Sequence, residues 1–393
     1  MKIALLTKHI YPYAIGGMQR HSFYLAKYLA RNGIYVDLYH CGGVNKERHM
    51  KDLLSTEEQN FINEYEFEYP QSIYFPGHYL KDSYELSKSI FSILKDKVDV
   101  DFIYVQGFAG WELMRQKRNG FDAPPVGINF HGLNMYQKLP SLKGGAQLLM
   151  LRPFVSKLLR EADYVFHFGG KQIEILESLG IKRRQMFLSP NAIDSDWLVS
   201  EPSKQSDTLR FLYIGRYERL KGIEELYKII DEIGSAFSCE FHFVGPIPEK
   251  KKKSGENIKY WGVLHDKYDV RKVIRSCDVL LCPSFSEGMP TVILEAMASG
   301  LAIIATDVGA VSHMVDQENG WLIEPGNLYQ MKNAIESACK ADDKELFDKK
   351  SISIKKVRYN FTWDKAIITT IRSIEEILQL EHDDISKTNS YIQ

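Results

Sequence analysis

The chain is poor in the features that mark secreted, membrane-spanning or zinc-stabilised proteins. Its 393 residues include only five cysteines, and no two of them form a Cys-x-x-Cys pair. This pattern argues against a disulfide framework and a structural zinc site, and a reducing cytoplasmic compartment fits best. No run of about 20 apolar residues occurs, so no transmembrane helix is expected. The first residues also lack the apolar stretch of a secretory signal peptide.

An excess of either charge is also missing. Lysine and arginine together number 50 and aspartate and glutamate 51, which gives a formal net charge of −1. This balance excludes a protein that binds nucleic acid through its overall charge, and no nucleic-acid partner is expected. Hydrophobic residues at 44% and charged residues at 26% are typical of a globular chain. The dinucleotide fingerprint G-x-G-x-x-G is absent, which argues against a nicotinamide cofactor.

Short runs of β-branched, aliphatic and aromatic residues recur along the chain, with helical patterns such as Met18–Arg31 between them. The runs show little alternation, which is typical of strands buried on both faces of a parallel sheet. Repeated strand–helix units predict doubly wound α/β sheets with right-handed crossovers. Six strands are predicted in each half: Lys2–Thr7, Tyr35–Cys41, Phe102–Gln106, Val126–Phe130, Tyr164–Phe168 and Met186–Leu188, then Phe211–Gly215, Glu240–Val244, Lys259–Val263, Val279–Cys282, Ala302–Ala305 and Trp321–Ile323.

The repetition predicts two similar domains, residues 1–190 and 191–393. The linker is expected near Ser189–Asp207, a stretch rich in proline and serine. A final helix is predicted over about Trp363–Leu380, with packing back on the first domain left open, and a frayed polar tail over Glu381–Gln393. Ligands of open α/β sheets bind beyond the carboxyl ends of the strands, so the cleft between the domains is the expected site.

Two candidate positions follow predicted strands of the first half. The pair Gly16-Gly17 opens a helix, where the backbone can approach a ligand closely and exposed N–H groups favour an anion. An ordinary turn explains the glycines equally well. His131, in Phe130-His131-Gly132, is well placed for the cleft, although a lone histidine at a turn more often has a structural role. No histidine belongs to a set with metal-ligand spacing, so no metal site is expected.

The first loop of the second half carries two cations beside glycines, in Gly215-Arg216 and Lys221-Gly222. A guanidinium fork and an ammonium in one loop are suited to binding a diphosphate. The alternative is a solvated helix start, but basic residues at a helix N-terminus oppose the macrodipole. We therefore favour a functional interpretation for Arg216 and Lys221.

The strongest signal is a pair of carboxylates separated by seven residues, Glu287 and Glu295. Glu287 lies in the loop after a buried strand, and Glu295 lies in the apolar run of the helix that follows. A lone carboxylate in that run is costly unless it has a partner. A ligand diol is a good partner, because one carboxylate accepts two hydrogen bonds. The alternative is a glutamate at the helix rim that reaches water or an arginine.

Taken in their order along the chain, the segments that carry these candidate residues resemble those of glycosyltransferase family 4. This family is a group of retaining enzymes with the GT-B architecture of two facing Rossmann-like domains. The resemblance spans nearly the whole chain and includes the segment Ser189–Asp194. The Glu287 to Glu295 stretch is highly specific in this order, whereas the glycine pair and the histidine are weak signals alone. Two residues depart from the family pattern. Ala192 stands where members often have glycine, and Gln19 stands where many have glutamate.

The resemblance implies roles for the first candidates. The backbone of Gly16 and Gly17 would face the donor phosphate or the acceptor. His131 would lie beside the transferred sugar, near its C6 hydroxyl. Arg216 and Lys221 would neutralise the leaving diphosphate.

The same resemblance implies a donor site built on the carboxylate pair. Glu287, with the backbone amides of the segment Gly288, Met289 and Pro290, would bind sugar hydroxyls. Glu295 would bind the ribose diol, and Asn191 would belong to the same donor-binding set.

The activity implied by the resemblance is the transfer of a sugar from a nucleotide-diphosphate sugar, with a UDP-sugar favoured, to an acceptor hydroxyl. The acceptor is expected to be a saccharide or a lipid-linked molecule of surface polysaccharide or glycolipid synthesis. No metal and no cofactor beyond the co-substrate are expected. Attack occurs on the face of the departing diphosphate, a donor phosphate oxygen receives the acceptor proton, and no protein nucleophile is assigned.

Two other functions remain open. A non-hydrolysing nucleotide-sugar 2-epimerase shares the two-domain architecture, but it needs acid and base carboxylates and no acceptor. A non-catalytic two-domain sugar-binding protein is the other alternative. The pair Arg216 and Lys221 argues against it, because a neutral sugar does not require two cations.

Three weaker features have simpler explanations. Asp99-Val100-Asp101 reads as the metal-binding D-x-D signature, but it lies at the amino edge of the sheet and is interpreted as a solvated turn. The basic run Glu249–Lys253 is interpreted as a solvated loop. The amphipathic stretch Gln147–Arg160 is interpreted as a helix packed on the core. Contact of these two stretches with anionic lipid is the weaker alternative, so a peripheral place on the inner face of the membrane stays open.

Overall fold

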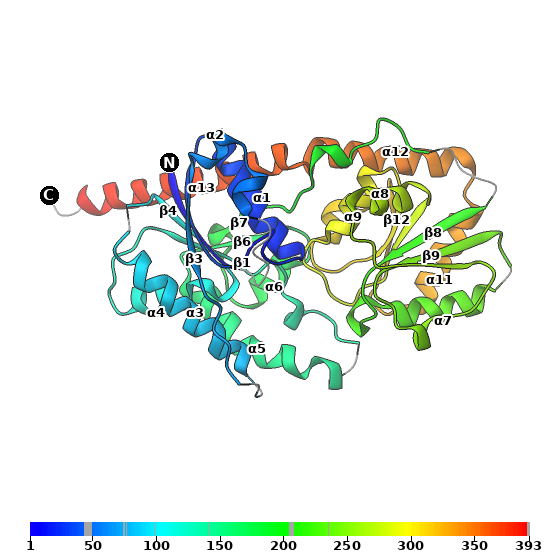
Figure 1. The fold of residues 1–393 in the computed structure, drawn as a ribbon, viewed down its shortest axis with the longest axis horizontal. Coiled ribbons are helices and arrows are strands. Elements are labelled where there is room, and N and C mark those ends of the chain that lie inside the picture. The colour runs from blue at the N-terminus through cyan, green and yellow to red at the C-terminus, as the bar shows by residue number, and fades with distance from the viewer. Residues whose placement is uncertain are drawn as a thin grey trace.

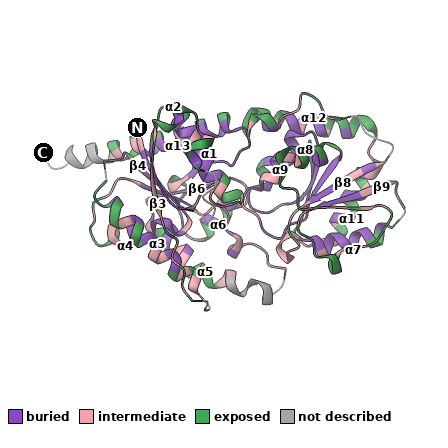
Figure 2. Cartoon of the chain, in the orientation of Figure 1, coloured by how far each residue is buried: buried purple, intermediate pink, exposed green. Residues whose placement is uncertain are grey.

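The computed structural model describes residues 1–42, 49–73, 75, 77–97, 99–140, 142–203, 208–234 and 236–390. Strands and helices alternate and form two α/β lobes side by side along the longest axis of the molecule (Figure 1). The predicted doubly wound architecture is confirmed. Buried residues gather on the strands at the centre of each lobe, and exposed residues lie on the outer helices (Figure 2).

The first lobe contains a sheet of seven parallel strands in the order β3-β2-β1-β4-β5-β6-β7. The order reverses between β1 and β4, where loops at the carboxyl edge diverge and leave room for a ligand. The strands are β1 (Lys2–His9), β2 (Tyr35–Cys41), β3 (Ile62–Phe67), β4 (Phe102–Gln106), β5 (Val126–Asn129), β6 (Tyr164–His167) and β7 (Met186–Leu188).

The prediction of six strands for this half is wrong, because β3 was missed. The segment carries Asn63, Glu64 and Glu66 among its six residues, so it lacks the apolar run of a central strand. It forms the edge of the sheet, and its residues are exposed or half-buried. Edge strands tolerate such polar residues because one side of the ladder has no neighbour.

The second lobe contains six parallel strands, as predicted, in the order β10-β9-β8-β11-β12-β13. The strand order again reverses, here between β8 and β11. The strands are β8 (Leu209–Ile214), β9 (Cys239–Val244), β10 (Ile258–Gly262), β11 (Val279–Cys282), β12 (Ala302–Thr306) and β13 (Gly320–Ile323).

Helices cover both sheets. The helix predicted over Met18–Arg31 is present and begins one residue earlier. The helices are α1 (Gly17–Arg31), α2 (Thr56–Gln59), α3 (His78–Leu94), α4 (Trp111–Arg118), α5 (Leu142–Glu161), α6 (Gln172–Ser178), α7 (Ile223–Ile233), α8 (Lys267–Arg275), α9 (Thr291–Ala298), α10 (Val311–Met314), α11 (Leu328–Lys340), α12 (Asp343–Asn360) and α13 (Trp363–Ser390).

Helix α13 starts near the second lobe and runs along the first, where it appears red in Figure 1. Its residues Trp363, Ile367 and Ile374 belong to the same buried cluster as Ile3 and Leu5 of β1. The last helix of the chain therefore completes the core of the first lobe.

The predicted frayed tail is wrong up to residue 390, because α13 continues to Ser390. The hydroxyl of Tyr164 on β6 donates a hydrogen bond to Glu381 at 2.7 Å, which holds the helix beyond its predicted end at Leu380. The last residues of that tail, 391–393, lie outside the described residues.

The chain passes between the lobes twice, and the two passages are hydrogen-bonded to each other. The N–H of Ile193 donates to the carbonyl of Phe361, and the N–H of Trp363 donates to the carbonyl of Ile193, each at 3.0 Å. Residues 204–207 of the predicted linker lie outside the described part of the chain. A hinge between the lobes therefore contains two hydrogen-bonded backbone segments, which limits independent rotation of either lobe.

Candidate active site

The two lobes touch through loops that follow their strands at the carboxyl edges. His131-Gly132 follows β5 of the first lobe, and Glu287-Gly288 follows β11 of the second. A Cβ atom added to Gly288 would lie 2.3 Å from the carbonyl oxygen of His131. Gly288 therefore permits an approach between backbones that no larger residue allows.

Polar side chains fasten this contact. Gln137 donates through Nε2 to the carbonyl of Glu287 at 2.7 Å and accepts from its N–H at 3.3 Å. Lys138 donates to the carbonyl of Pro325 at 2.7 Å. Lys171 of the first lobe lies 3.0 Å from a carboxylate oxygen of Asp307. These residues connect the lobes in the arrangement described here, and the sequence analysis singled out none of them.

At the cleft, Lys221 and Glu287 are paired. The ammonium of Lys221, in a short turn of 3-10 helix, lies 2.7 Å from Oε1 of Glu287, and the hydroxyl of Ser284 donates to the same oxygen at 2.7 Å. Burial alone lowers the pKa of Lys221, but attraction to the Glu287 carboxylate outweighs burial and raises that pKa above its usual value. The ammonium of Lys221 is therefore charged at neutral pH.

Arg216 lies in the same loop as Lys221 but points elsewhere. Its side chain is 69% exposed, and its guanidinium lies 3.1 Å from Glu218. The carbonyl of Arg216 accepts a hydrogen bond from the hydroxyl of Tyr213 at 3.1 Å, which fixes the backbone of the loop. Of the two predicted clamp residues, Lys221 faces the other candidate residues, and Arg216 has a side chain free to change rotamer.

The His131 ring stands at the first-lobe side of the cleft. Its backbone has a φ of 58°, in the left-handed region, and is held by Asn129, which accepts from the His131 N–H at 2.7 Å, and by Gln172, which donates to its carbonyl at 3.0 Å. The ring packs edge-on against His21, with centroids 4.7 Å apart. Such a conformation in a non-glycine residue costs free energy and is maintained by these contacts.

The Nε2 atom of His131 is buried and has no hydrogen-bond partner among the described residues. Burial lowers the pKa of His131 to about 3, so the ring is neutral at physiological pH. An unpaired buried nitrogen is uncommon because it forfeits a hydrogen bond to water. A neutral imidazole here is suited to a single hydrogen bond with a polar ligand atom.

Glu295 lies in α9 with its side chain 13% exposed, and its nearest described cation is Arg20, whose Nη1 is 4.0 Å away. Burial raises the pKa of Glu295, and Arg20 offsets that effect only in part. An arginine was one of the partners considered for this glutamate, and Arg20 occupies that place at a distance too long for a hydrogen bond.

Arg20 also connects Glu295 to the glycine pair. Gly16 is the N-cap of α1 and its carbonyl accepts from the N–H of Arg20 at 3.0 Å, while a Cβ atom on Gly17 would meet nothing within 4 Å. Arg20 was not among the residues predicted from the sequence, although its place one turn after the glycine pair was a usable signal. The glycine pair and Glu295 thus come to one region of the cleft.

Asn191 supports the turn before α9. It is buried, donates through Nδ2 to the carbonyl of Met289 at 3.1 Å, and accepts from the N–H of Ala192 at 2.9 Å. The expectation that Pro290 offers a backbone amide proton is wrong, because proline has no N–H. Pro290 is instead the N-cap residue of α9, so Gly288 and Met289 carry the donor groups of this turn.

The described residues contain no group of three or more histidine, cysteine, aspartate or glutamate side chains placed to hold a metal ion. Asp99 and Asp101 of the D-x-D sequence lie at the amino edge of the first sheet. Asp99 accepts from the Lys2 ammonium at 2.9 Å, and Asp101 accepts from the Lys2 backbone N–H at 2.7 Å. Each aspartate is thus hydrogen-bonded to Lys2, at the edge of the sheet opposite the cleft.

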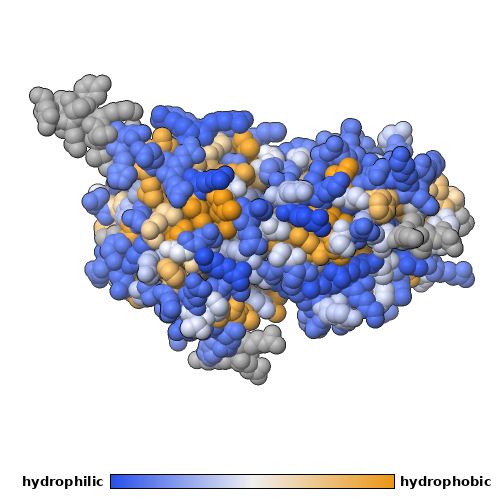
Figure 3. Space-filling view, turned by 90° about the horizontal axis from the view of Figure 1, so that it is seen from above, coloured by the Kyte–Doolittle hydropathy of each residue, from blue (hydrophilic) through white to orange (hydrophobic). Residues whose placement is uncertain are grey.

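The two stretches considered for lipid contact have partners of their own. In α5, Val155, Leu158 and Leu159 are buried in the first-lobe core, although Met150 is 50% exposed; the side chain of Gln147 lies outside the description. In the basic run, Lys252 pairs with Glu249 and Lys253 with Asp231. On the face shown in Figure 3, hydrophobic residues form separate patches among hydrophilic ones. Within the described helices, none has the length and apolarity to cross a bilayer.

Comparison with known families decides the class of protein. The profile of Glycosyltransferase Family 4 matches residues 15–197, and that of Glycosyl transferases group 1 matches residues 208–341. The chain belongs to glycosyltransferase family 4. The first profile matches most of the first lobe and the second profile most of the second lobe, and together they include every candidate residue.

Curated relatives of this glycosyltransferase share parts or all of its length. TuaC of Bacillus subtilis, named for teichuronic acid biosynthesis, is 36% identical over 32% of this chain and 31% of its own. The glycosyltransferase MJ1178 of Methanocaldococcus jannaschii is 26% identical over 96% of this chain and 99% of its own.

Solved structures share the fold of the family 4 chain. Sucrose-phosphate synthase from Thermosynechococcus elongatus has a TM-score of 0.74 at 19% identity, over 96% of this chain and 99% of that one. Anabaena HepE, solved with UDP-glucose, has a TM-score of 0.63 at 18% identity, over 96% and 99% of the two chains.

Proposed function

We propose that this family 4 chain is a retaining glycosyltransferase that moves a sugar from a nucleotide-diphosphate sugar to an acceptor hydroxyl. The observation that carries the proposal is the pairing of Lys221 with Glu287 directly across the cleft from the loop of His131, with Gln137 joining the two loops. A cation for a diphosphate, a carboxylate for sugar hydroxyls and a neutral imidazole meet where the two sheets end.

In this proposal, the donor is a nucleoside diphosphate sugar, with UDP favoured. Anabaena HepE was solved with UDP-glucose, and an Escherichia coli trehalose-6-phosphate protein with UDP-2-fluoro glucose. Glu295, buried and with its pKa raised, gains two hydrogen bonds if it accepts them from the ribose diol. The backbone of Gly17 is open for the phosphates or the acceptor, whereas the Gln19 side chain lies against Gly16.

Catalysis in this proposal rests on charge and position. Cleavage of the sugar–phosphate bond leaves negative charge on the diphosphate, and Lys221 with Arg216 stabilises that charge as it grows. Lys221 then shares its ammonium between the phosphate and Glu287, and the second carboxylate oxygen of Glu287 is available to sugar hydroxyls. The acceptor proton passes to a donor phosphate oxygen on the same face, without a protein nucleophile.

The acceptor in this proposal is a saccharide or lipid-linked molecule of surface polysaccharide or glycolipid synthesis, made in the cytoplasm. The names of TuaC and of a Campylobacter jejuni enzyme that acts on a diphospho-undecaprenol saccharide support this class. Peripheral contact with the inner face of the membrane is compatible with such an acceptor.

A donor screen tests the proposal. The protein is incubated with a panel of nucleotide sugars, first without acceptor, and products are followed by mass spectrometry and by NMR of the anomeric signal. We expect slow release of nucleoside diphosphate from one donor, and transfer with an unchanged anomeric configuration once an acceptor is added. Inversion of that configuration contradicts the retaining mechanism. Conversion of the donor into its 2-epimer without acceptor supports the epimerase instead.

A further inference from the structure

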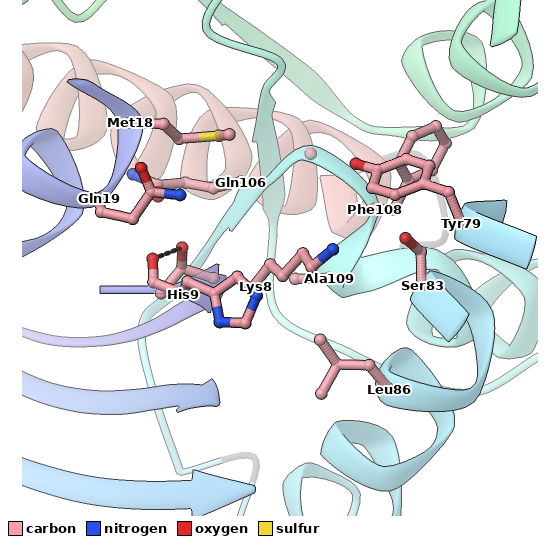
Figure 4. A pocket seen from close by; sticks show the side chains of 12 residues that line it. Lys8, His9, Met18, Gln19, Tyr79, Ser83, Leu86, Gln106, Phe108 and Ala109 are labelled. Atoms are coloured by element: carbon pink, nitrogen blue, oxygen red, sulfur yellow. Dashed lines mark hydrogen bonds between the residues drawn. The ribbon is translucent and has the colours of Figure 1, made fainter. Parts of the chain in front are cut away.

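A second hollow lies within the first lobe, at the carboxyl ends of β1 and β4 and beside the start of α1. It encloses about 430 Å³, with the space at its mouth included. Figure 4 shows that the side chain of Lys8 extends across it toward Tyr79 and Ser83, with Leu86 on one wall. We call it the Lys8 pocket; it is lined by Thr7, Lys8, His9, Met18, Gln19, Tyr79, Ser83, Leu86, Gln106, Gly107, Phe108 and Ala109.

The ammonium of Lys8 is held by aromatic side chains, without an anionic partner among the described residues. Its Nζ donates to the hydroxyl of Tyr69 at 2.6 Å and lies 3.9 Å from the centre of the Tyr69 ring and 4.6 Å from that of Tyr79. No carboxylate of the described residues lies within 4.0 Å of it. Most lysines at this depth have an acidic partner, because an isolated buried charge is costly.

Burial lowers the pKa of Lys8 to about 8, and the more distant Cys41 and Asp82 only partly oppose this effect. The ammonium is therefore still mostly charged at neutral pH, and it would be stabilised by a negative group that entered the pocket. The ammonium lies at the side of the pocket formed by Tyr79 and Ser83 (Figure 4).

The remaining walls suit a sugar ring. Phe108 and Tyr79 contribute aromatic surface, with ring centres 6.0 Å apart, and Leu86 contributes aliphatic surface. Gln19 contributes an amide group and stands on the first turn of α1, two residues after the pair Gly16-Gly17. Gln106 also lines the pocket, but its amide is hydrogen-bonded to Ser22 and His21. The pocket therefore lies beside the loop expected to face the donor.

We propose that the Lys8 pocket binds the acceptor through a negatively charged group, a carboxylate or a phosphate, carried near the reacting hydroxyl. This inference rests on the proposed function and specifies, in addition, that the acceptor carries a negative charge. The phosphates of the donor have their own cations, Arg216 and Lys221, in the second lobe. Lys8 thus determines specificity for the acceptor without taking part in breaking the donor bond.

Lys8→Met tests the proposal, because methionine keeps the packing on Tyr69 and Tyr79 and removes the charge. The matched control is Lys88→Met on α3. Lys88 also lies over a tyrosine, Tyr84, at 5.4 Å, but it is paired with Glu85 at 2.7 Å and lies outside the pocket.

Calorimetry or ligand-observed NMR measures binding of three probes: methyl glucuronide, glucose 6-phosphate and methyl glucoside. We expect the wild type to prefer one of the two anionic probes, and Lys8→Met to weaken that probe on the order of 10–100-fold, the range of a charge-assisted hydrogen bond. Lys8→Met should bind the neutral probe and UDP with unchanged affinity. The Lys88→Met control should bind every probe as the wild type does. Preference for the glucuronide identifies a carboxylate, and preference for the sugar phosphate identifies a phosphate.

Equal affinity of the wild type for charged and neutral probes overturns the proposal, as does an unchanged Lys8→Met variant. Weaker UDP binding by Lys8→Met also overturns it, because Lys8 would then serve the donor. The two proposals fail separately. If Lys8→Met transfers sugar from a nucleotide sugar with an unchanged KM for the acceptor, the role of the Lys8 pocket is rejected and the proposed function stands. Charge-dependent probe binding without any transfer from a donor panel rejects the glycosyltransferase activity alone.

Discussion

The ammonium of Lys221 and the carboxylate of Glu287 lie 2.7 Å apart, so the cation expected on the diphosphate and the carboxylate expected on the sugar are each other's partners. Ser284 shares the same carboxylate oxygen, and Gln137 holds the Glu287 backbone from the other lobe. A change at one residue of the pair therefore removes a hydrogen-bond partner of the other.

Arg216→Ala and Lys221→Ala should each lower turnover by roughly 10²–10³-fold, by analogy with removal of one preorganised donor from an anion site. The double variant should lose less than the product, because both cations act on one charge. Arg216→Lys should recover activity only in part, since the guanidinium fork is lost. Steady-state kinetics on folded variants measures these effects, and full activity in both single alanine variants contradicts the mechanism.

Arg219→Ala is the control for this series. Arg219 belongs to the same loop, but its guanidinium binds Glu225 at 2.7 and 2.9 Å. Its loss should leave turnover near normal. Thermal unfolding should also distinguish Arg216 from Lys221. Arg216→Ala removes a 69% exposed side chain and should unfold at the same temperature as the wild type. Lys221→Ala leaves Glu287 without its cation and should unfold at a lower temperature.

Glu295→Ala and Glu287→Ala should differ in what they bind. If Glu295 accepts from the ribose diol, its loss should weaken the bare nucleoside diphosphate and the full donor alike, by about 1.5–3 kcal/mol. Glu287→Ala should spare the bare nucleotide, because it leaves Lys221 available to phosphate, and should impair the full donor and turnover. Calorimetry with UDP and with a UDP-sugar measures both. The reverse pattern rejects these assignments.

Removal of divalent metals should leave activity intact. The proposed clamp is cationic already, and no metal-binding group of three or more side chains is found in the described part of the chain. Turnover is measured after dialysis against EDTA, and again after addition of Mn²⁺ or Mg²⁺. If turnover is lost after dialysis and returns only when metal is added, Arg216 and Lys221 are not sufficient to neutralise the diphosphate.

The sequence predicted the repeated strands because central strands such as Phe102–Gln106 are continuous apolar runs, and periodicity reports burial directly. It missed β3, whose polar residues suit an edge. It predicted Lys221 and Glu287 as separate contacts, since their pairing joins two loops 66 residues apart and depends on how the loops fold. Lys8 follows the predicted first strand, and the rule of seeking polar residues after strands would have selected it. Its aromatic neighbours come from later segments that no local pattern connects to it.

The last prediction concerns the stability cost of Glu295. Burial raises its pKa above the usual 4.5. At pH values below the pKa of the unfolded chain, the carboxyl group is protonated in both states and contributes nothing. As pH rises through that value, the unfolded chain releases its proton first, so stability falls until the pKa of the folded protein is passed, and the loss is then constant.

Glu295→Gln removes the charge and keeps the shape. We expect this variant to be more stable than the wild type at pH 7–8 and to lose that advantage as the pH falls toward 4.5. Denaturant unfolding across this pH range measures the difference, with Glu336→Gln as the control, because Glu336 on α11 is half-exposed and paired with Lys340 at 3.2 Å. The same variant should bind UDP more weakly, because an amide accepts fewer hydrogen bonds from a diol. A variant less stable than the wild type at pH 7.5 would mean that the attraction of Arg20, 4.0 Å away, exceeds the cost of burial.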